Sequence, residues 1–158
     1  ANGTRAISVW NGGGLSFTVL PDRCLDIAEV RYCGNNMSYI TPSGIVAPQF
    51  FDPDGISWLR SFGGGFLTTC GLENIGVADG TPDLTMHGRI GNTPCENLCV
   101  DPDDDGLGVT IKGTAREAVL FGRKLTLRGV FTARTESALP TLSQTAALRK
   151  SRSRCSIT

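Results

Sequence analysis

The chain has 158 residues, the size of one domain that can bury a substantial core. Its 15 basic and 15 acidic side chains balance each other, which excludes the strongly basic composition of many nucleic-acid-binding and membrane-surface proteins. No apolar run is long enough to span a membrane, and the first residues lack the pattern of an export signal. We therefore expect a cytoplasmic protein whose partners are neither nucleic acids nor membranes.

Seven short segments have the apolar or alternating pattern of β-strands. The first two are separated by Asn11 and three glycines, which favours a hairpin. Many short strands with turns between them predict an all-β antiparallel sandwich. In chain order, the predicted strands are residues 6–10, 15–21, 26–32, 37–40, 96–100, 107–115 and 124–134. A turn is expected at 33–36, and residues 116–123 form either a short strand or the turn between the last two strands.

The middle of the chain carries turn residues instead of strands. Residues 41–54 contain three prolines and two adjacent phenylalanines, which predicts a long loop, and residues 56–62 favour a single helical turn. Residues 58–94 hold many glycines and the only histidine of the chain. Glycine permits backbone conformations and close approaches to a ligand that other residues resist. We expect a ligand site in this stretch, although a loop-rich connection without a site has a similar composition.

The sequence predicts no metal site and no organic cofactor. Six cysteines stand at scattered positions, and without an export signal they are expected to be reduced thiols. Cys95 and Cys99 lack a nearby second pair of ligands, whereas a structural zinc ion normally takes four. Residues 101–106 match the start of a calcium loop, but Lys112 stands where a bidentate glutamate should be. A solvated turn between strands is the preferred interpretation of that acidic segment.

The pattern changes near residue 135. Residues 135–158 show no strand alternation and end with basic residues among serines, which is typical of a disordered segment. We therefore divide the chain into residues 1–134, which form the sandwich, and a basic tail of residues 135–158, which is either disordered or not native to the fold. A basic tail that binds an acidic partner is the functional alternative.

Three motifs resemble the DUF4432-type family of galactose mutarotase-like proteins, which are related to aldose 1-epimerases. They are GGGLSFTVLPDRCLDI (12–27), WLRSFGGGFLTTCGLENIG (58–76) and MHGRIGNTP (86–94). The resemblance covers the N-terminal part of the family pattern, from near residue 7 to about residue 134. Cys24 stands where the family usually has glycine, so a positive φ at this turn would be strained. Arg23 and Asp26 of the first motif are expected to form an internal ion pair.

The resemblance implies an antiparallel supersandwich with a sugar cleft, here incomplete, and the opening and reclosure of an aldose ring. That reaction needs a general acid and a general base within hydrogen-bond reach of the sugar. The family's acid histidine and base glutamate lie beyond the region of resemblance, whereas His87 corresponds to an earlier histidine that binds the sugar near its ring oxygen. We therefore expect this chain to be a truncated form, with a frame shift near residue 135 as one cause.

Five residues are the candidates for the site. His87 is the candidate catalytic residue, and the alternative is a core histidine with its hydrogen bonds satisfied. The candidates for substrate binding are Arg60, Glu73, Arg89 and Asn92. Guanidinium groups can hold vicinal hydroxyls or an acidic group. Arg60 in a surface ion pair and Arg89 beside a buried acid are the corresponding structural alternatives.

The function implied by the resemblance is that of an aldose 1-epimerase-like isomerase acting on a small sugar or sugar derivative. Whether this chain alone is an active enzyme stays open, because the expected acid and base are missing from it. The alternative function is a non-catalytic carbohydrate-binding module on the same sandwich. A partial gene product with exposed sheet edges is a third possibility. The oligomeric state and the identity of the sugar are open.

Overall fold

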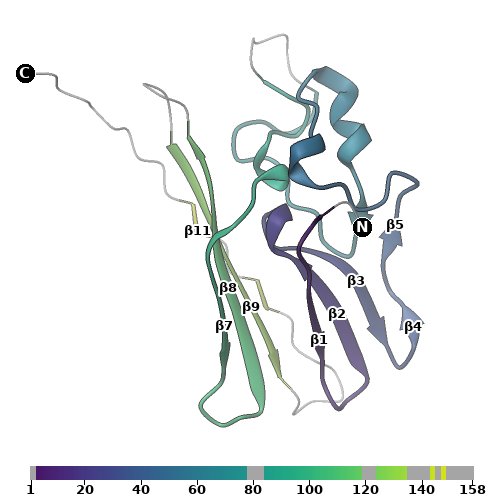
Figure 1. Ribbon diagram of the computed structural model, residues 1–158, viewed down its shortest axis with the longest axis vertical. Helices are drawn as coiled ribbons and strands as arrows, with labels where there is room; N and C mark the ends of the chain where they lie inside the picture. Colours follow the sequence, from purple (N-terminus) through teal and green to yellow (C-terminus); the bar gives the residue numbers. More distant parts are fainter. Residues whose placement is uncertain (1–2, 78–83, 119–123, 135–142, 145–146, 149–158) are drawn as a thin grey trace, which may run out of the picture.

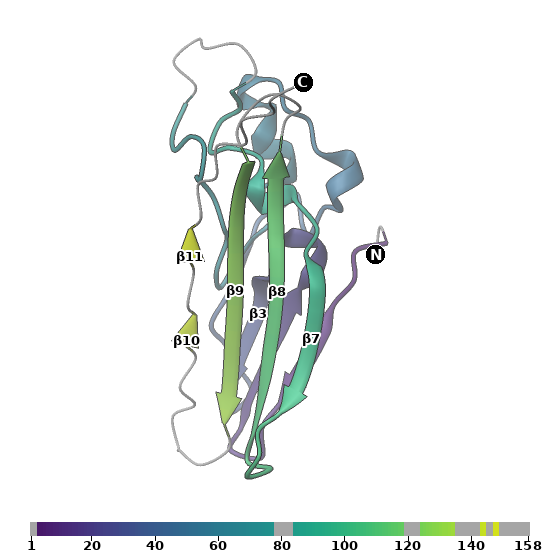
Figure 2. The ribbon, with the colours of Figure 1, turned by 90° about the vertical axis from the view of Figure 1, so that its left-hand side faces the viewer.

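The computed structural model describes residues 3–77, 84–118, 124–134, 143–144 and 147–148. They contain two facing antiparallel sheets and a small two-stranded sheet (Figures 1 and 2). The first sheet has the order β1-β2-β3-β4 and the second the order β10-β9-β8-β7, with β11 also paired to β9. The predicted all-β sandwich is confirmed. Within these ranges no helix is long and apolar enough to cross a membrane.

The first sheet is a meander of neighbouring strands. β1 pairs with β2, β2 with β3, and β3 with β4, always antiparallel. Alternate residues of β2, namely Leu15, Phe17 and Val19, are buried, as the alternation of apolar and polar side chains predicts. The bounds are β1 Ile7–Trp10, β2 Leu15–Leu20, β3 Asp26–Tyr32 and β4 Asn35–Asn36.

The second sheet is built on one long hairpin. β8 and β9 pair without interruption from Gly108 opposite Arg134 to Ala118 opposite Lys124. β7 lies on the other side of β8, and Figure 2 shows these three strands in front of the first sheet. The bounds are β7 Glu96–Pro102, β8 Gly108–Ala118, β9 Lys124–Arg134, β10 Ser143–Gln144 and β11 Ala147–Leu148.

The core between the sheets is centred on Leu25, whose side chain is fully buried. Leu25 contacts the second sheet where two glycines, Gly113 and Gly129, are paired in register. A Cβ added to these glycines would come within 3.0 Å and 2.8 Å of Leu25 Cδ1, respectively. Because only residues without a side chain leave room there, the glycine pair lets Leu25 of one layer pack directly on the other layer.

The corner that presents Leu25 has an unusual backbone. The short 3₁₀ turn η1 (Pro21–Arg23) ends at Cys24, which has a φ of 55°, and Leu25 has a φ of 63°. Both residues are therefore left-handed, a conformation that costs a residue with a side chain about 1 kcal/mol or more. The sequence predicts strain at Cys24 if this turn has a positive φ, and the structure has that φ.

The expected strand at 37–40 differs from the structure. Only Tyr39–Ile40 forms a strand, β5, which pairs with β6 (Gly64–Gly65), whereas Asn35–Asn36 of the expected turn forms β4. The cause is a turn closed by side chains, in which the Ser38 N–H donates to Asn36 Oδ1 and the Asn36 Nδ2 donates to the Ser38 carbonyl. This turn separates the two short strands.

Residues 41–77 and 84–95 lie mainly at one end of the sandwich, drawn from blue to teal in Figure 1. These described residues contain three 3₁₀ segments: η2 (Pro48–Phe50), η3 (Gly55–Ser61) and η4 (Ile90–Asn92). The helical turn expected at 56–62 is thus confirmed as η3. Part of this region, residues 78–83, lies outside the described residues, as do residues 119–123 of the ambiguous segment between β8 and β9.

Candidate functional site

Ring contacts join the separate loops at this end of the sandwich. The indole of the buried Trp58, in η3, stacks on Phe62 with ring centroids 5.2 Å apart. The same indole contacts the imidazole of His87 at 4.8 Å between centroids, with the rings tilted by 56°. Trp58 therefore links the first loop segment, which also carries Arg60, to the segment that carries His87.

The backbone of His87 is fixed on both sides. His87 has a left-handed φ of 58°, its N–H donates to the Gly76 carbonyl at 3.0 Å, and its carbonyl accepts from the Gly71 N–H at 2.8 Å. Histidine is one of the few residues with a side chain that adopts this conformation with some frequency. Gly88 follows with a φ of 73°, and a Cβ there would come within 2.6 Å of the Gly71 carbonyl. The turn therefore requires glycine directly after the histidine.

The hydrogen bond on the His87 ring determines which nitrogen can donate. Nδ1 accepts a hydrogen bond of 3.1 Å from the Gly76 N–H. In the neutral imidazole the proton must then lie on Nε2. Among the described residues Nε2 has no hydrogen-bond partner. It is also not one of the fully buried polar atoms that lack a partner. The half-buried ring therefore presents an Nε2–H donor to solvent, which is unlike a core histidine with both nitrogens satisfied.

Two arginines reach solvent near these loops. The exposed guanidinium of Arg89 lies 5.9 Å from the centre of the Phe51 ring and forms no ion pair with any described residue. Arg60, whose side chain is 78% exposed, lies 3.5 Å from an Asp52 carboxylate oxygen. A long exposed pair of this kind contributes little to stability. Both guanidinium groups are thus accessible to a ligand, and adjacent residues, Phe51 and Asp52, contact them.

Asn92 has a different environment. It is buried, and its Oδ1 accepts a hydrogen bond of 2.7 Å from Nη1 of Arg23, which also donates to the Val46 carbonyl at 3.0 Å. Its Nδ2 is buried without a partner among the described residues. Asn92 is thus buried beneath the loops, unlike the exposed arginines, and its role in substrate binding stays a prediction.

Glu73 lies in the turn that supports His87. Gly71 and Asn74, on either side of it, form an isolated bridge, and Asn74 Nδ2 donates to the carbonyls of Gly76 and Thr85. Glu73 itself is half-buried. The structure thus brings the Glu73 turn against the backbone on both sides of His87, and Glu73 stays a candidate hydroxyl acceptor.

Arg23 and Asp26 do not form the direct ion pair that the sequence suggested. Asp26 Oδ1 accepts from the Thr69 N–H at 2.6 Å, while Arg23 donates to Asn92 and Val46. Burial raises the pKa of Asp26 to about 7, and burial lowers the pKa of Arg23. Each side chain instead forms hydrogen bonds with uncharged groups of the loops. The two charges therefore interact only through space.

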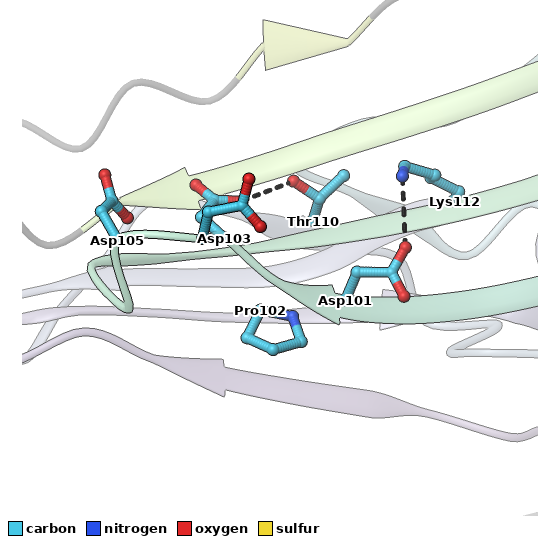
Figure 3. Close-up of a pocket in the computed structure, with 7 residues that line it drawn as sticks. Asp101, Pro102, Asp103, Asp105, Thr110 and Lys112 are labelled. Atoms are coloured by element: carbon cyan, nitrogen blue, oxygen red, sulfur yellow. Dashed lines mark hydrogen bonds and ion pairs between the residues drawn. The ribbon is translucent and has the colours of Figure 1, made fainter.

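The acidic segment at the end of β7 borders a shallow hollow lined by Asp101, Asp103 and Lys112, among others (Figure 3). Lys112 Nζ lies 3.2 Å from Asp101, and Thr110 Oγ1 donates to Asp103 at 3.0 Å. Backbone bonds from Asp103 to Gly108 and from Gly106 to Asp103 close the turn. In the described part of the chain no three His, Cys, Asp or Glu side chains are placed to hold a metal ion. The predicted turn between strands is present, as these backbone bonds show, and the absence of a metal site stays a prediction.

A comparison with protein families matches residues 1–146 to the model described as a domain of unknown function, DUF4432. The chain belongs to the DUF4432 family. The match continues past residue 134 to residue 146 and includes β10. The domain boundary at residue 134 stays a prediction, since most of residues 135–158 lie outside the described residues.

The fold of this DUF4432 chain is similar to a crystal structure from Klebsiella pneumoniae of a protein provisionally named an aldose 1-epimerase. The TM-score is 0.75 at 24% sequence identity, and the match covers 85% of this chain but 37% of that one. At this identity the likeness shows the fold, which is mutarotase-like. No curated protein matches the chain significantly.

Some contacts of the site were not predicted. Phe51, whose ring lies beneath Arg89, comes from a segment distant in sequence, and Gly76, the partner of the His87 ring, lies 11 residues before it. The two adjacent phenylalanines in a proline-rich loop were the available signal for Phe51. Nothing in the local pattern distinguishes Gly76 from the other glycines of the stretch.

Proposed function

We propose that the chain binds an aldose at the loop cluster around His87, as part of an aldose 1-epimerase-like isomerase that interconverts anomers. The observation that carries this proposal is the accessible Nε2–H of His87, fixed by the Gly76 hydrogen bond to Nδ1 and by the ring contact with Trp58. The mutarotase-like fold and the DUF4432 membership support it.

The proposed role of His87 follows from the chemistry of ring opening. The ring oxygen of the sugar gains a proton as the C1–O bond breaks, while the C1 hydroxyl loses one to a base. An Nε2–H held toward solvent can donate to the ring oxygen and stabilise the charge that develops there. Because Nδ1 is already engaged, the imidazole cannot rotate to present the other nitrogen without losing the bond to Gly76.

Arg89 and Arg60 are proposed to hold the hydroxyl groups of the sugar. Each guanidinium has several donors in a fixed planar arrangement that matches neighbouring oxygens. Phe51 restricts Arg89, so less side-chain freedom is lost when a ligand binds. Glu73 is proposed to accept a hydroxyl hydrogen from the same ligand, whereas Asn92 supports the loops through Arg23.

The chain alone is proposed to bind sugar while accelerating anomer interconversion only slightly. The chain contains one histidine, and His87 is proposed to support the reaction. The further proton-transfer pair implied by the family resemblance has no counterpart among the matched motifs. Removing one member of an acid–base pair commonly costs a factor of about 100 to 10,000 in rate.

The test combines calorimetric titration with a panel of neutral and acidic aldoses and polarimetry of their mutarotation. The matched variant is His87→Asn, because asparagine also tolerates a positive φ and so preserves the turn. We expect saturable binding to at least one sugar, a small acceleration, and the loss of both in the variant. Binding that is the same in the variant, or no binding to any sugar, contradicts the proposal. Binding that depends on His87 without any acceleration would assign a non-catalytic binding module.

A further inference from the structure

Two thiols meet inside the core where the two sheets join. Cys24 and Cys95 are 2% and 8% exposed, and their side chains share a hydrogen bond. The Cys24 N–H donates to the Thr93 carbonyl at 3.1 Å, and the Cys95 N–H donates to the Pro21 carbonyl at 2.8 Å. These two backbone bonds hold the segments carrying the thiols side by side, and both side chains pack in the same core cluster.

The two thiols are not equivalent. The hydrogen bond from Cys24 lowers the pKa of Cys95, and the same bond, together with burial, raises the pKa of Cys24. Arg5, which pairs with Asp22, also favours a negative charge on Cys95. Thiolates attack oxidants and thiols do not, so Cys95 is the more reactive member of the pair. Its greater exposure agrees with this order.

We propose that Cys24 and Cys95 form a redox-sensitive clasp that a peroxide closes to a disulfide. The Cys95 sulfur attacks one peroxide oxygen and forms a sulfenic acid with release of water. The Cys24 sulfur then attacks the Cys95 sulfur, the S–O bond breaks, and the second water leaves. Two thiols and one hydrogen peroxide thus give one disulfide and two waters, with both electrons passing from the sulfurs to the peroxide.

The positions of Cys24 and Cys95 determine which part of the chain a disulfide would close into a loop. Residues 24–95 form the segment between the two thiols, and all five candidate site residues lie within it. The hydrogen bond between Arg23 and Asn92 joins the same two ends beside the thiols. A disulfide would therefore close this segment at its base covalently, where the reduced chain holds it by hydrogen bonds. This proposal does not depend on the sugar-binding function.

Three other described cysteines provide the comparison. Cys33, Cys70 and Cys99 are exposed, and Cys99 donates to Asp101 at 2.9 Å. Exposed thiols react with peroxide but have no second described thiol beside them, so they stop at sulfenic or higher acids. Buried contact, rather than exposure, is what distinguishes Cys24 and Cys95.

The experiment uses the full chain with Cys33, Cys70, Cys99 and Cys155 replaced by serine, treated with hydrogen peroxide in the folded state. We expect a peptide pair linked through Cys24 and Cys95 by mass spectrometry, and a higher urea midpoint because the bridge restricts the unfolded chain. A reductant should reverse both changes. The matched variant adds Cys24→Gly, which suits the left-handed backbone and leaves Cys95 without a partner. In it, Cys95 should be trapped by dimedone as a sulfenic acid.

Two outcomes overturn the proposal. One is equal dimedone labelling of Cys95 with and without Cys24, which would show that the thiols do not meet after oxidation. The other is a linked peptide that forms only in denaturant, which would show that the folded geometry prevents the bridge. A folded Cys24→Gly chain, checked by circular dichroism, keeps the first comparison valid.

Discussion

Arg23 donates a buried hydrogen bond of 2.7 Å to Asn92, and this bond joins the 3₁₀ turn η1 to the 3₁₀ turn η4. Arg23 has a second bond to Val46 in the loop between them. The guanidinium is almost completely buried, and burial lowers its pKa. The buried guanidinium therefore joins three loop segments beneath the candidate site by hydrogen bonds. Its uncharged partners compensate for part of the water that the charge loses on burial.

Replacing Asn92 should test this role. Asn92→Ala removes one of two partners of a buried cation, and we expect a loss of about 2 to 3 kcal/mol in the free energy of unfolding. Asn92→Asp keeps an oxygen acceptor for Arg23 and should lose much less. Urea unfolding followed by circular dichroism measures both. Equal stability of the Ala variant and the unmodified chain would show that Asn92 does not support the loops.

The left-handed backbone at Cys24 predicts an inverted order of substitutions. Cys24→Ala loses the buried sulfur and keeps the strain, whereas Cys24→Gly loses the sulfur and relieves it. We expect the Gly variant to be more stable than the Ala variant by about 1 kcal/mol. Thermal unfolding of the two reduced variants gives the comparison. Lower stability of the Gly variant would mean that the turn does not require a positive φ.

Because Asp26 is buried, we expect the free energy of unfolding to fall as the pH rises. Burial raises its pKa from 3.8 to about 7, and the Thr69 hydrogen bond offsets only part of the shift. Because the folded carboxyl binds its proton more tightly than the unfolded one, its stabilising contribution is complete below the unfolded pKa. That contribution is lost as the pH rises toward about 7, and it amounts to roughly 4 kcal/mol at most.

Asp26→Asn is the matched variant for this effect, since its amide oxygen still accepts from Thr69 and carries no charge. Urea midpoints of both chains from about pH 4 to about pH 8 measure it. The unmodified chain should lose stability relative to the variant across this window, and the difference cancels every other titrating group. Burial acts to raise the pKa of Asp22, but its bonds to Arg5 outweigh this and lower the pKa. Asp22 therefore titrates below the window. Parallel curves would contradict a raised pKa.

The exposed arginines should separate binding from stability. Arg89→Ala and Arg60→Ala remove exposed side chains, so each should change the free energy of unfolding by less than about 0.5 kcal/mol. If they hold a sugar, each should weaken its binding by about tenfold. Arg116→Ala is the control and should leave the affinity unchanged. Arg116 is an exposed residue of β8 that pairs with Glu96. Unchanged affinity in all three variants would remove the arginines from the site.

The strands were predictable because alternation is a local property of the sequence. Residues 26–32 and 124–134 were predicted with the bounds that the structure gives to β3 and β9. β8 continues three residues further than predicted, through Arg116–Ala118, because the long register with β9 carries the pairing onward. β4 was missed, since its formation depends on the side-chain bonds between Asn36 and Ser38.

The site was predictable only in part. The many glycines and the single histidine of residues 58–94 indicated where backbone turns and a polar ring would meet. The ring contact of Trp58 with His87 and the bond from Gly76 to the His87 ring join separate loop segments, and such contacts leave no periodic pattern in the sequence. The burial of Asn92 could not be read from its neighbours, because it depends on Arg23 reaching across the fold.

The most direct test of the sugar site observes His87 itself. Because the chain contains one histidine, the ¹⁵N spectrum of the imidazole, recorded on tag-free protein, reports this residue alone. For the neutral ring, we predict the Nε2–H form and a saturable shift of the Nε2 resonance as an aldose is added. The Nδ1–H form, or a spectrum that no aldose in the panel changes, would contradict the account.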